Sequence, residues 1–76
     1  SLFNKELKRS VAALDEHHRI SFVLRYMQEL SIKEIAAITE VSEGTVKSRL
    51  YYATKKITTK LEVFNPRNEG NLFKIQ

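Results

Sequence analysis

An apolar stripe near the middle of the chain constrains the local fold more than any other feature. Its members recur at spacings of four, three, four and four residues: Val46, Leu50, Ala53, Ile57 and Leu61. Residues three and four apart lie on one face of an α-helix, so the stripe predicts an amphipathic helix that buries one side. Ser42, just before it, belongs to a residue type that caps helix N-termini. We therefore expect a helix over residues 43–62, with its stripe facing a core.

Helical spacing also appears in the segments before this stripe. Only two glycines and one proline interrupt the 76 residues, and strand signals are weak. We expect helices over about residues 4–13, 16–28 and 32–39. The apolar positions expected to pack are Phe3, Leu7, Val11 and Leu14 in the first, Ile20, Val23, Leu24 and Met27 in the second, and Ile35, Ala36 and Ile38 in the third.

Capping residues support two of these helix starts. Asp15 precedes the second helix and can cap it with its carboxylate. Ser31 and Glu34 have the spacing of a capping box, in which the serine hydroxyl accepts from the third amide and the carboxylate accepts from the cap amide. The third helix should therefore begin directly after Ser31.

Positive charge is concentrated on the last helix. The chain has a net charge of +4 from thirteen basic and nine acidic residues. Residues 44–60 hold five basic residues and no acidic residue. The five are Lys47, Arg49, Lys55, Lys56 and Lys60. The other eight basic residues of the chain are balanced by its nine acidic residues. Such a segment is expected of a protein that binds phosphate backbones, although a solvated lysine-rich face would look the same from charge alone.

Several function classes lack the residues that they need. There is no cysteine, which fits a reducing, cytoplasmic setting and excludes disulfides and thiolate metal sites. His17 and His18 are adjacent, so on a helix they point about 100° apart and do not converge on one ion. No nucleophile–base arrangement or glycine-rich phosphate loop is present, and no apolar run approaches the roughly 20 residues that span a membrane. We expect neither an enzyme nor a cofactor or metal site, and no membrane segment.

The order of elements indicates a helix-turn-helix. A short helix, a short turn and a basic amphipathic helix are the plan in which the second helix enters the major groove of DNA. The first helix of the pair then crosses the backbone, with its N-terminal amides free to face a phosphate. The predicted fold class is all-α: a small four-helix domain with a helix-turn-helix over about residues 31–61, winged-helix-like but without a sheet.

The segment LSIKEIAAITEVSEGTVKSRLYYATKKI, residues 30–57, resembles region 4 of bacterial RNA polymerase sigma factors of the extracytoplasmic-function (ECF) class. The family pattern has an arginine-containing helix with a segment like VLRY, then LSxxEIA, a turn, and VSxGTVKSRL. The corresponding stretches here are HRISFVLRY, LSIKEIA and VSEGTVKSRLYYATKKI. The resemblance covers most of the chain. It implies one region 4 domain over residues 1–76, with a tail from residue 62. The start at Ser1 rather than methionine leads us to expect a piece of a longer protein.

The resemblance also implies a function and a set of site residues. Region 4 recognises the −35 element of promoters in double-stranded DNA and docks on the β-flap of core RNA polymerase. Carried over by position, base-edge contacts would fall to Lys47, Ser48, Tyr51 and Tyr52. Phosphate contacts would fall to Ser31, Lys33, Thr45, Arg49 and Lys55. An anti-sigma factor is a further possible partner, and region 4 domains work as monomers on the polymerase.

Four positions depart from the family pattern. Glu29 and Glu40 stand where many relatives carry glycine, at the end of the second helix and in the turn. A left-handed backbone at Glu40 would cost on the order of 1 kcal/mol. Thr39 replaces a usual leucine, and Asp15 replaces a usual proline.

Two alternatives stay open at the level of sequence. A LuxR-type output domain of a response regulator shares the EIA and TVK motifs, although SRLYYATKKI departs from the continuation of that family. A protein-interaction module, bound by an anti-sigma factor, would use the same surfaces. In the tail, Leu72, Phe73 and Ile75 either dock on the domain or a partner or belong to a frayed terminus.

Overall fold

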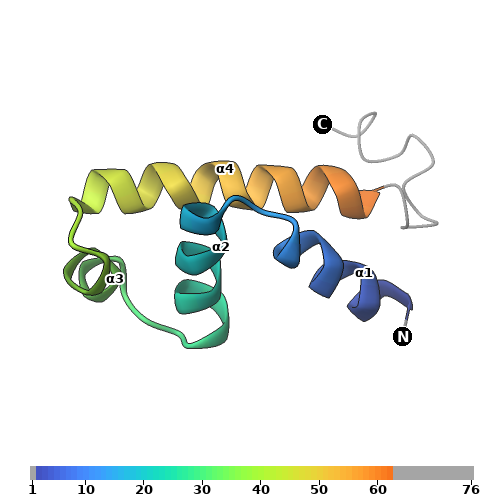
Figure 1. The fold of residues 1–76 in the computed structure, drawn as a ribbon, viewed down its shortest axis with the longest axis horizontal. Coiled ribbons are helices and arrows are strands. Elements are labelled where there is room, and N and C mark those ends of the chain that lie inside the picture. The colour runs from blue at the N-terminus through green and yellow to red at the C-terminus, as the bar shows by residue number, and fades with distance from the viewer. Residues whose placement is uncertain (1, 63–76) are drawn as a thin grey trace, which may run out of the picture.

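The chain folds into a small all-α domain (Figure 1). The structure is a computed structural model, and it describes residues 2–62. The predicted four-helix class is confirmed, and no strand occurs within the described residues. The elements in chain order are α1 Leu2–Ala12, α2 Glu16–Phe22 continued by the π-helical segment η1 Val23–Met27, α3 Ile32–Thr39, and α4 Glu43–Glu62.

Helix α4 is the element on which the other three pack. In Figure 1 it lies across the picture, with α3 seen nearly end-on beneath its start, α2 at its middle and α1 beneath its C-terminal half. Helix α3 therefore runs roughly perpendicular to α4, and the two ends of α3 lie on opposite sides of it. The α3–turn–α4 pair forms the predicted helix-turn-helix.

Two apolar clusters form the core, and the stripe of α4 takes part in both. The first joins α1 to the C-terminal half of α4 through Val11, Leu14, Ala53 and Ile57. The second joins α3 to the N-terminal half through Ile35, Ala36, Val46 and Leu50. Four of the five stripe residues are thus buried and Leu61 is half-buried, which confirms the prediction for α4.

Some residues predicted to pack are exposed instead: Phe3, Ile20, Met27 and Ile38. Ile38 is 60% exposed and Met27 52% exposed. The error at Met27 has a structural cause, because the π-helical hydrogen bond from the Gln28 amide to the Val23 carbonyl (3.0 Å) widens the last turn. The α-helical spacing used for the prediction fails after such a turn. On α2 the fully buried residue is Ser21, while Val23 and Leu24 are half-buried.

The caps of α3 and α4 form as predicted, but that of α2 does not. The Ser31 amide donates to Glu34 Oε1 (2.8 Å), and the Glu34 amide donates to Ser31 Oγ (3.0 Å), completing the capping box. At α4, the Thr45 amide donates to Ser42 Oγ (3.0 Å). The Asp15 side chain makes no cap hydrogen bond; its backbone carbonyl accepts from the Arg19 amide (2.8 Å) instead. The prediction of a carboxylate cap was wrong.

Two helices end on a glutamate with left-handed backbone. Glu29 follows η1 with φ 57°, and Glu40 ends α3 with φ 58°. These are the two positions where the region 4 pattern that the sequence resembles often has glycine, which adopts this conformation without a Cβ clash. The chain therefore has the left-handed turn geometry at both positions, but with glutamate, whose Cβ makes this backbone conformation strained.

The predictions for the tail, including Leu72, Phe73 and Ile75, lie outside the described residues. Within those residues, no helix combines the length and the apolar character needed to cross a bilayer.

Candidate nucleic-acid interface

The exposed surface of α4 divides into an outer edge and two flanks. Successive residues of an α-helix are about 100° apart, so residues one before and one after the buried Val46 project to opposite sides. We call the side of Lys47 and Thr54, two turns apart, the Lys47 flank. The side of Arg49 and Lys56, also two turns apart, is the Arg49 flank. Between them runs the outer edge, which holds Ser48 and Lys55 at about 160–180° from Val46.

Four of the predicted contact residues lie together along the outer edge and the Lys47 flank. Lys47, Ser48, Tyr51 and Lys55 are all exposed. Lys55 Nζ lies 5.8 Å from the centroid of the Tyr51 ring, which is within cation–π range and holds the ammonium beside the ring. The arrangement offers two ammonium groups, a hydroxyl and a phenol ring on one surface.

Helix α3 presents its N-terminus on the same side. Its C-terminal residues Ile38 and Thr39 line a depression with Arg49, so its beginning, on the other side of α4, lies toward the Lys47 flank (Figure 1). The capping box occupies the amides of Ser31 and Glu34. Among the described residues, the next two amides, of Ile32 and Lys33, have no partner and point out of the helix start, where a phosphate is favoured.

The Glu34 carboxylate is held in its ionised form by this cap. The hydrogen bond from the Ser31 backbone amide is the largest cause, and the Ser31 side chain adds to it; together they lower the pKa of Glu34. The same hydrogen bonds fix the entry of the chain into α3. The position of Lys33 relative to α4 therefore depends on this box.

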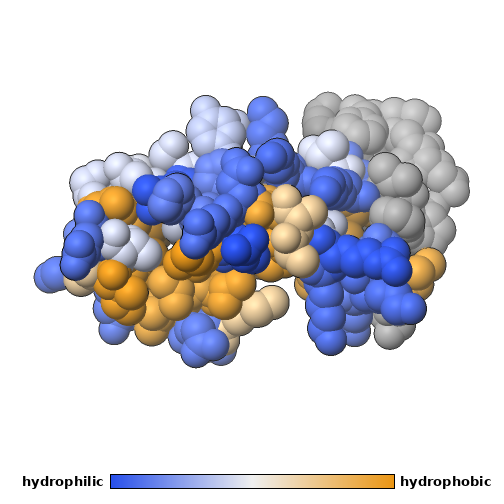
Figure 2. All heavy atoms as spheres, in the orientation of Figure 1, coloured by the Kyte–Doolittle hydropathy of each residue, from blue (hydrophilic) through white to orange (hydrophobic). Residues whose placement is uncertain are grey.

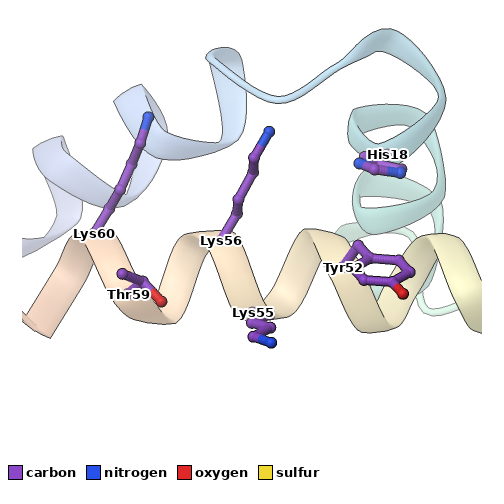
Figure 3. A pocket seen from close by; sticks show the side chains of 6 residues that line it. All are labelled: His18, Tyr52, Lys55, Lys56, Thr59 and Lys60. Atoms are coloured by element: carbon purple, nitrogen blue, oxygen red, sulfur yellow. The ribbon is translucent and has the colours of Figure 1, made fainter.

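Tyr52 lies toward the Arg49 flank, and Tyr51 is the predicted base contact that its ring meets. Its ring stacks on that of His18, with centroids 6.4 Å apart and planes at 20°, and it meets Tyr51 edge-on at 5.1 Å. Figure 3 shows the two rings facing each other, with Lys56 and Lys60 extending toward the side of His18 and Lys55 pointing away from it. A depression of about 580 Å³ opens here, lined by His18, Tyr52, Lys55, Lys56, Thr59 and Lys60.

Arg49 is half-buried in a second depression of about 420 Å³, which it shares with His17, Ile20, Ile38, Thr39 and Val41. It forms no ion pair within residues 2–62. Thr45 also faces this side; its amide donates to Ser42 Oγ, and its hydroxyl accepts from Ser42 (3.0 Å). The structure thus separates Thr45 and Arg49 from the residues around Lys47, while Tyr52 borders both groups through its contact with Tyr51.

Histidine residues do not gather into a metal site. The part of the chain that the structure describes contains no group of three side chains able to hold a metal ion. His17 lines the Arg49 depression, and His18 stacks on Tyr52 with its Nδ1 buried and without a hydrogen-bond partner.

One residue beside the interface was missed by sequence reasoning. Tyr26, on η1, lines a depression with Leu50, Tyr51, Thr54 and Lys55, on the Lys47 flank. The sequence carries no signal for this placement, because the π-helical turn that orients Tyr26 has no local sequence pattern.

Comparison with known proteins identifies the family. The model of the family "Sigma-70, region 4" matches residues 4–57. The chain belongs to this family. The ECF RNA polymerase sigma-E factors of Escherichia coli K12 and Salmonella typhi are 39% identical to it over 54 residues, which cover 71% of this chain and 28% of each relative. The RNA polymerase sigma factor FliA of E. coli K12 is 33% identical over 61 residues, covering 80% of this chain and 26% of FliA.

Because the chain belongs to the sigma-70 region 4 family, the alternative of a LuxR-type output domain is excluded. The matched residues 4–57 contain the helix-turn-helix except for the last five residues of α4. The chain spans little more than a quarter of the length of the curated relatives.

Proposed function

We propose that this sigma-70 region 4 domain binds double-stranded DNA at the −35 element of promoters and acts, in the cytoplasm, in transcription initiation by RNA polymerase. One observation carries the proposal. The buried stripe of α4 turns Lys47, Ser48, Tyr51 and Lys55 outward, on the side where α3 begins. A helix in the major groove needs this combination of an exposed polar edge and a neighbouring helix start.

Base reading falls to the outer edge of α4 and the parts of both flanks next to it. The Lys47 ammonium can donate to guanine O6 and N7, and Ser48 can donate or accept. The rings of Tyr51 and Tyr52 can contact thymine methyl groups. Because Tyr52 is stacked on His18, it would meet the groove from the Arg49 flank.

Phosphate contacts divide between the two strands that border the groove. Ser31, Lys33 and Lys55 would bind the strand on the side where α3 begins. Thr45 and Arg49 lie on the other flank, so their contacts require the opposite strand. Contacts of this kind position the domain and carry no sequence information directly.

Selection from a random duplex library tests the proposal. The 76-residue chain should enrich one short sequence, and its affinity for that duplex should fall with salt at a log–log slope of about −0.9 for each phosphate neutralised. No enrichment together with no salt dependence would rule out DNA binding.

Docking on core RNA polymerase is the second part of the proposed function, and exposed apolar residues on the Arg49 flank favour it. Figure 2 shows apolar side chains gathered over α3 and the adjoining part of α2 on the face that it presents. Ile20, Ile38 and Val41 line one depression, and Ile38 is 60% exposed. An exposed apolar patch of this kind marks a protein-contact surface. The β-flap of the polymerase is the proposed partner, and an anti-sigma factor would compete for the same face of a monomeric domain.

A pull-down with a β-flap fragment tests this docking. Ile38→Asp should abolish capture, whereas Lys47→Ala on the DNA side should leave it unchanged. Equal capture of both variants would place the polymerase contact elsewhere.

A further inference from the structure

The last turn of the second helix is π-helical, and Tyr26 lies within it. The Gln28 amide donates to the carbonyl of Val23, five residues back, and the Leu30 amide donates to that of Leu24, six residues back, each at 3.0 Å. Single π-helical turns are rare and are frequently found at functional sites. Here the turn leaves Tyr26 55% exposed on a helix whose other aromatic residue, Phe22, is half-buried.

The Tyr26 ring is held in place on the Lys47 flank of α4. It packs on Phe22 with centroids 4.8 Å apart and planes at 46°. It lines a depression of about 460 Å³ together with Leu50, Tyr51, Thr54 and Lys55. Thr54 lies two turns after Lys47 on the same side of α4, so this depression continues the proposed DNA surface.

The groups around the depression suit a sugar–phosphate backbone. The Tyr26 phenol and the Thr54 hydroxyl can each donate to a phosphate oxygen, and Lys55 supplies a positive charge. The rings of Tyr26 and Tyr51 offer apolar surface to a deoxyribose. None of the five lining residues is acidic, so nothing in the lining repels a phosphate.

We propose that Tyr26 is a DNA-backbone contact. In this arrangement the depression between η1 and α4 receives one phosphate and its sugar on the strand that the start of α3 also contacts. The inference rests on the proposed DNA binding and adds a residue to it. Because backbone contacts carry no sequence information, Tyr26 should contribute equally to every duplex.

Tyr26→Phe in the full chain tests the inference, because it removes the phenol oxygen and keeps the ring. Affinity should fall roughly 2- to 10-fold, as expected for one hydrogen bond, and by the same factor for the selected duplex and a scrambled one. The slope of affinity against salt should not change, because the phenol is neutral. Thr59→Val, which removes a hydroxyl from the depression beside His18, is the matched control and should bind like the wild type.

A scan with single methylphosphonate substitutions locates the contact. At one phosphate, neutralisation should weaken the wild type more than it weakens Tyr26→Phe. If the wild type and Tyr26→Phe bind the selected duplex equally well, the inference is overturned and the proposed function stays intact. A loss confined to the selected duplex would also overturn it, since that would make Tyr26 a base reader. A wild type without DNA affinity would instead overturn the proposed function itself.

Discussion

Ser21 is a polar residue in a fully buried position. It lies on α2, and its hydroxyl has no hydrogen-bond partner. Burying such a group unpaired costs about 1–3 kcal/mol.

Ser21→Ala should therefore raise the free energy of unfolding by about 1 kcal/mol or more. Urea denaturation monitored by circular dichroism measures the change. Ser48→Ala, on the exposed edge of α4, is the matched control, because it contributes the same gain in helix propensity without the buried hydroxyl. Equal gains in both variants would show that the Ser21 hydroxyl is satisfied in solution.

Glu40 carries strain of a different kind, in its backbone. With φ at 58°, its Cβ lies close to the following carbonyl oxygen, which costs roughly 1–2 kcal/mol. Glu40→Gly should relieve that strain at an entropic cost of about 0.5–1 kcal/mol.

The expected net result of Glu40→Gly is a gain of about 0.5–1 kcal/mol in unfolding free energy. Thermal denaturation measures it, with Ala37→Gly inside α3 as a control that should lose about 1 kcal/mol. A destabilised Glu40→Gly would mean that the glutamate side chain makes a compensating contact.

Among the elements, α3 owes its start to the Ser31–Glu34 box, and this makes its stability depend on pH. The pKa of Glu34 is lowered in the folded state by its hydrogen bonds to Ser31. A lowered pKa stabilises the fold above the unfolded-state value, and the contribution is lost as pH falls through the folded-state value.

Thermal denaturation of wild type and Glu34→Gln across the acid range tests this. Wild type should be the more stable protein at neutral pH, and the difference should shrink toward zero as pH falls through the lowered folded-state pKa of Glu34. The two proteins differ only at residue 34, so the difference isolates Glu34. A difference that stays constant with pH would contradict the assignment.

Local signals decided which elements could be predicted from sequence. The bounds of α3 and α4 agree with the prediction because Ser31, Glu34 and Ser42 mark their starts through bonds to nearby amides. The last turn of the second helix, η1, could not be predicted, because no local sequence pattern marks its π-helical bonds. The exposure of Met27 and the placement of Tyr26 follow from that turn. Ile38 was misassigned because its apolar character does not distinguish a core from a contact surface.

At the scale of the whole molecule, the domain has two faces separated by α4. The sequence predicted which side of α4 is buried, and so which residues face outward. It could not predict that α2 crosses α4 in a way that draws Tyr52 onto His18 and leaves Arg49 in an apolar depression. The two faces depend on where α2 lies relative to α4. The spacing of residues within α4 carries no information about that position.

The division of charge between the two faces has a measurable consequence. Lys55 points outward, whereas Lys60 extends toward the side of His18 (Figure 3). Lys55→Ala should reduce the log–log salt slope of DNA binding by about 0.9, the value for one phosphate contact. Lys60→Ala, which removes the same charge from the other side, should leave the slope unchanged, and an equal reduction in both would show that the charges act without regard to position.

The central claim is that the outer edge of α4 and the adjoining Lys47 flank read bases from the major groove, and Lys47→Ala tests it most directly. The quantity to measure is the ratio of affinities for the selected and the scrambled duplex, at one salt concentration, for wild type, Lys47→Ala and Lys33→Ala. Lys47→Ala should lower this ratio by about tenfold, as the loss of a base contact of 1–3 kcal/mol predicts, while Lys33→Ala should weaken both duplexes and leave the ratio unchanged. If Lys47→Ala weakened both duplexes by the same factor, Lys47 would contact only the backbone, and the surface around Lys47 would not be the reading surface.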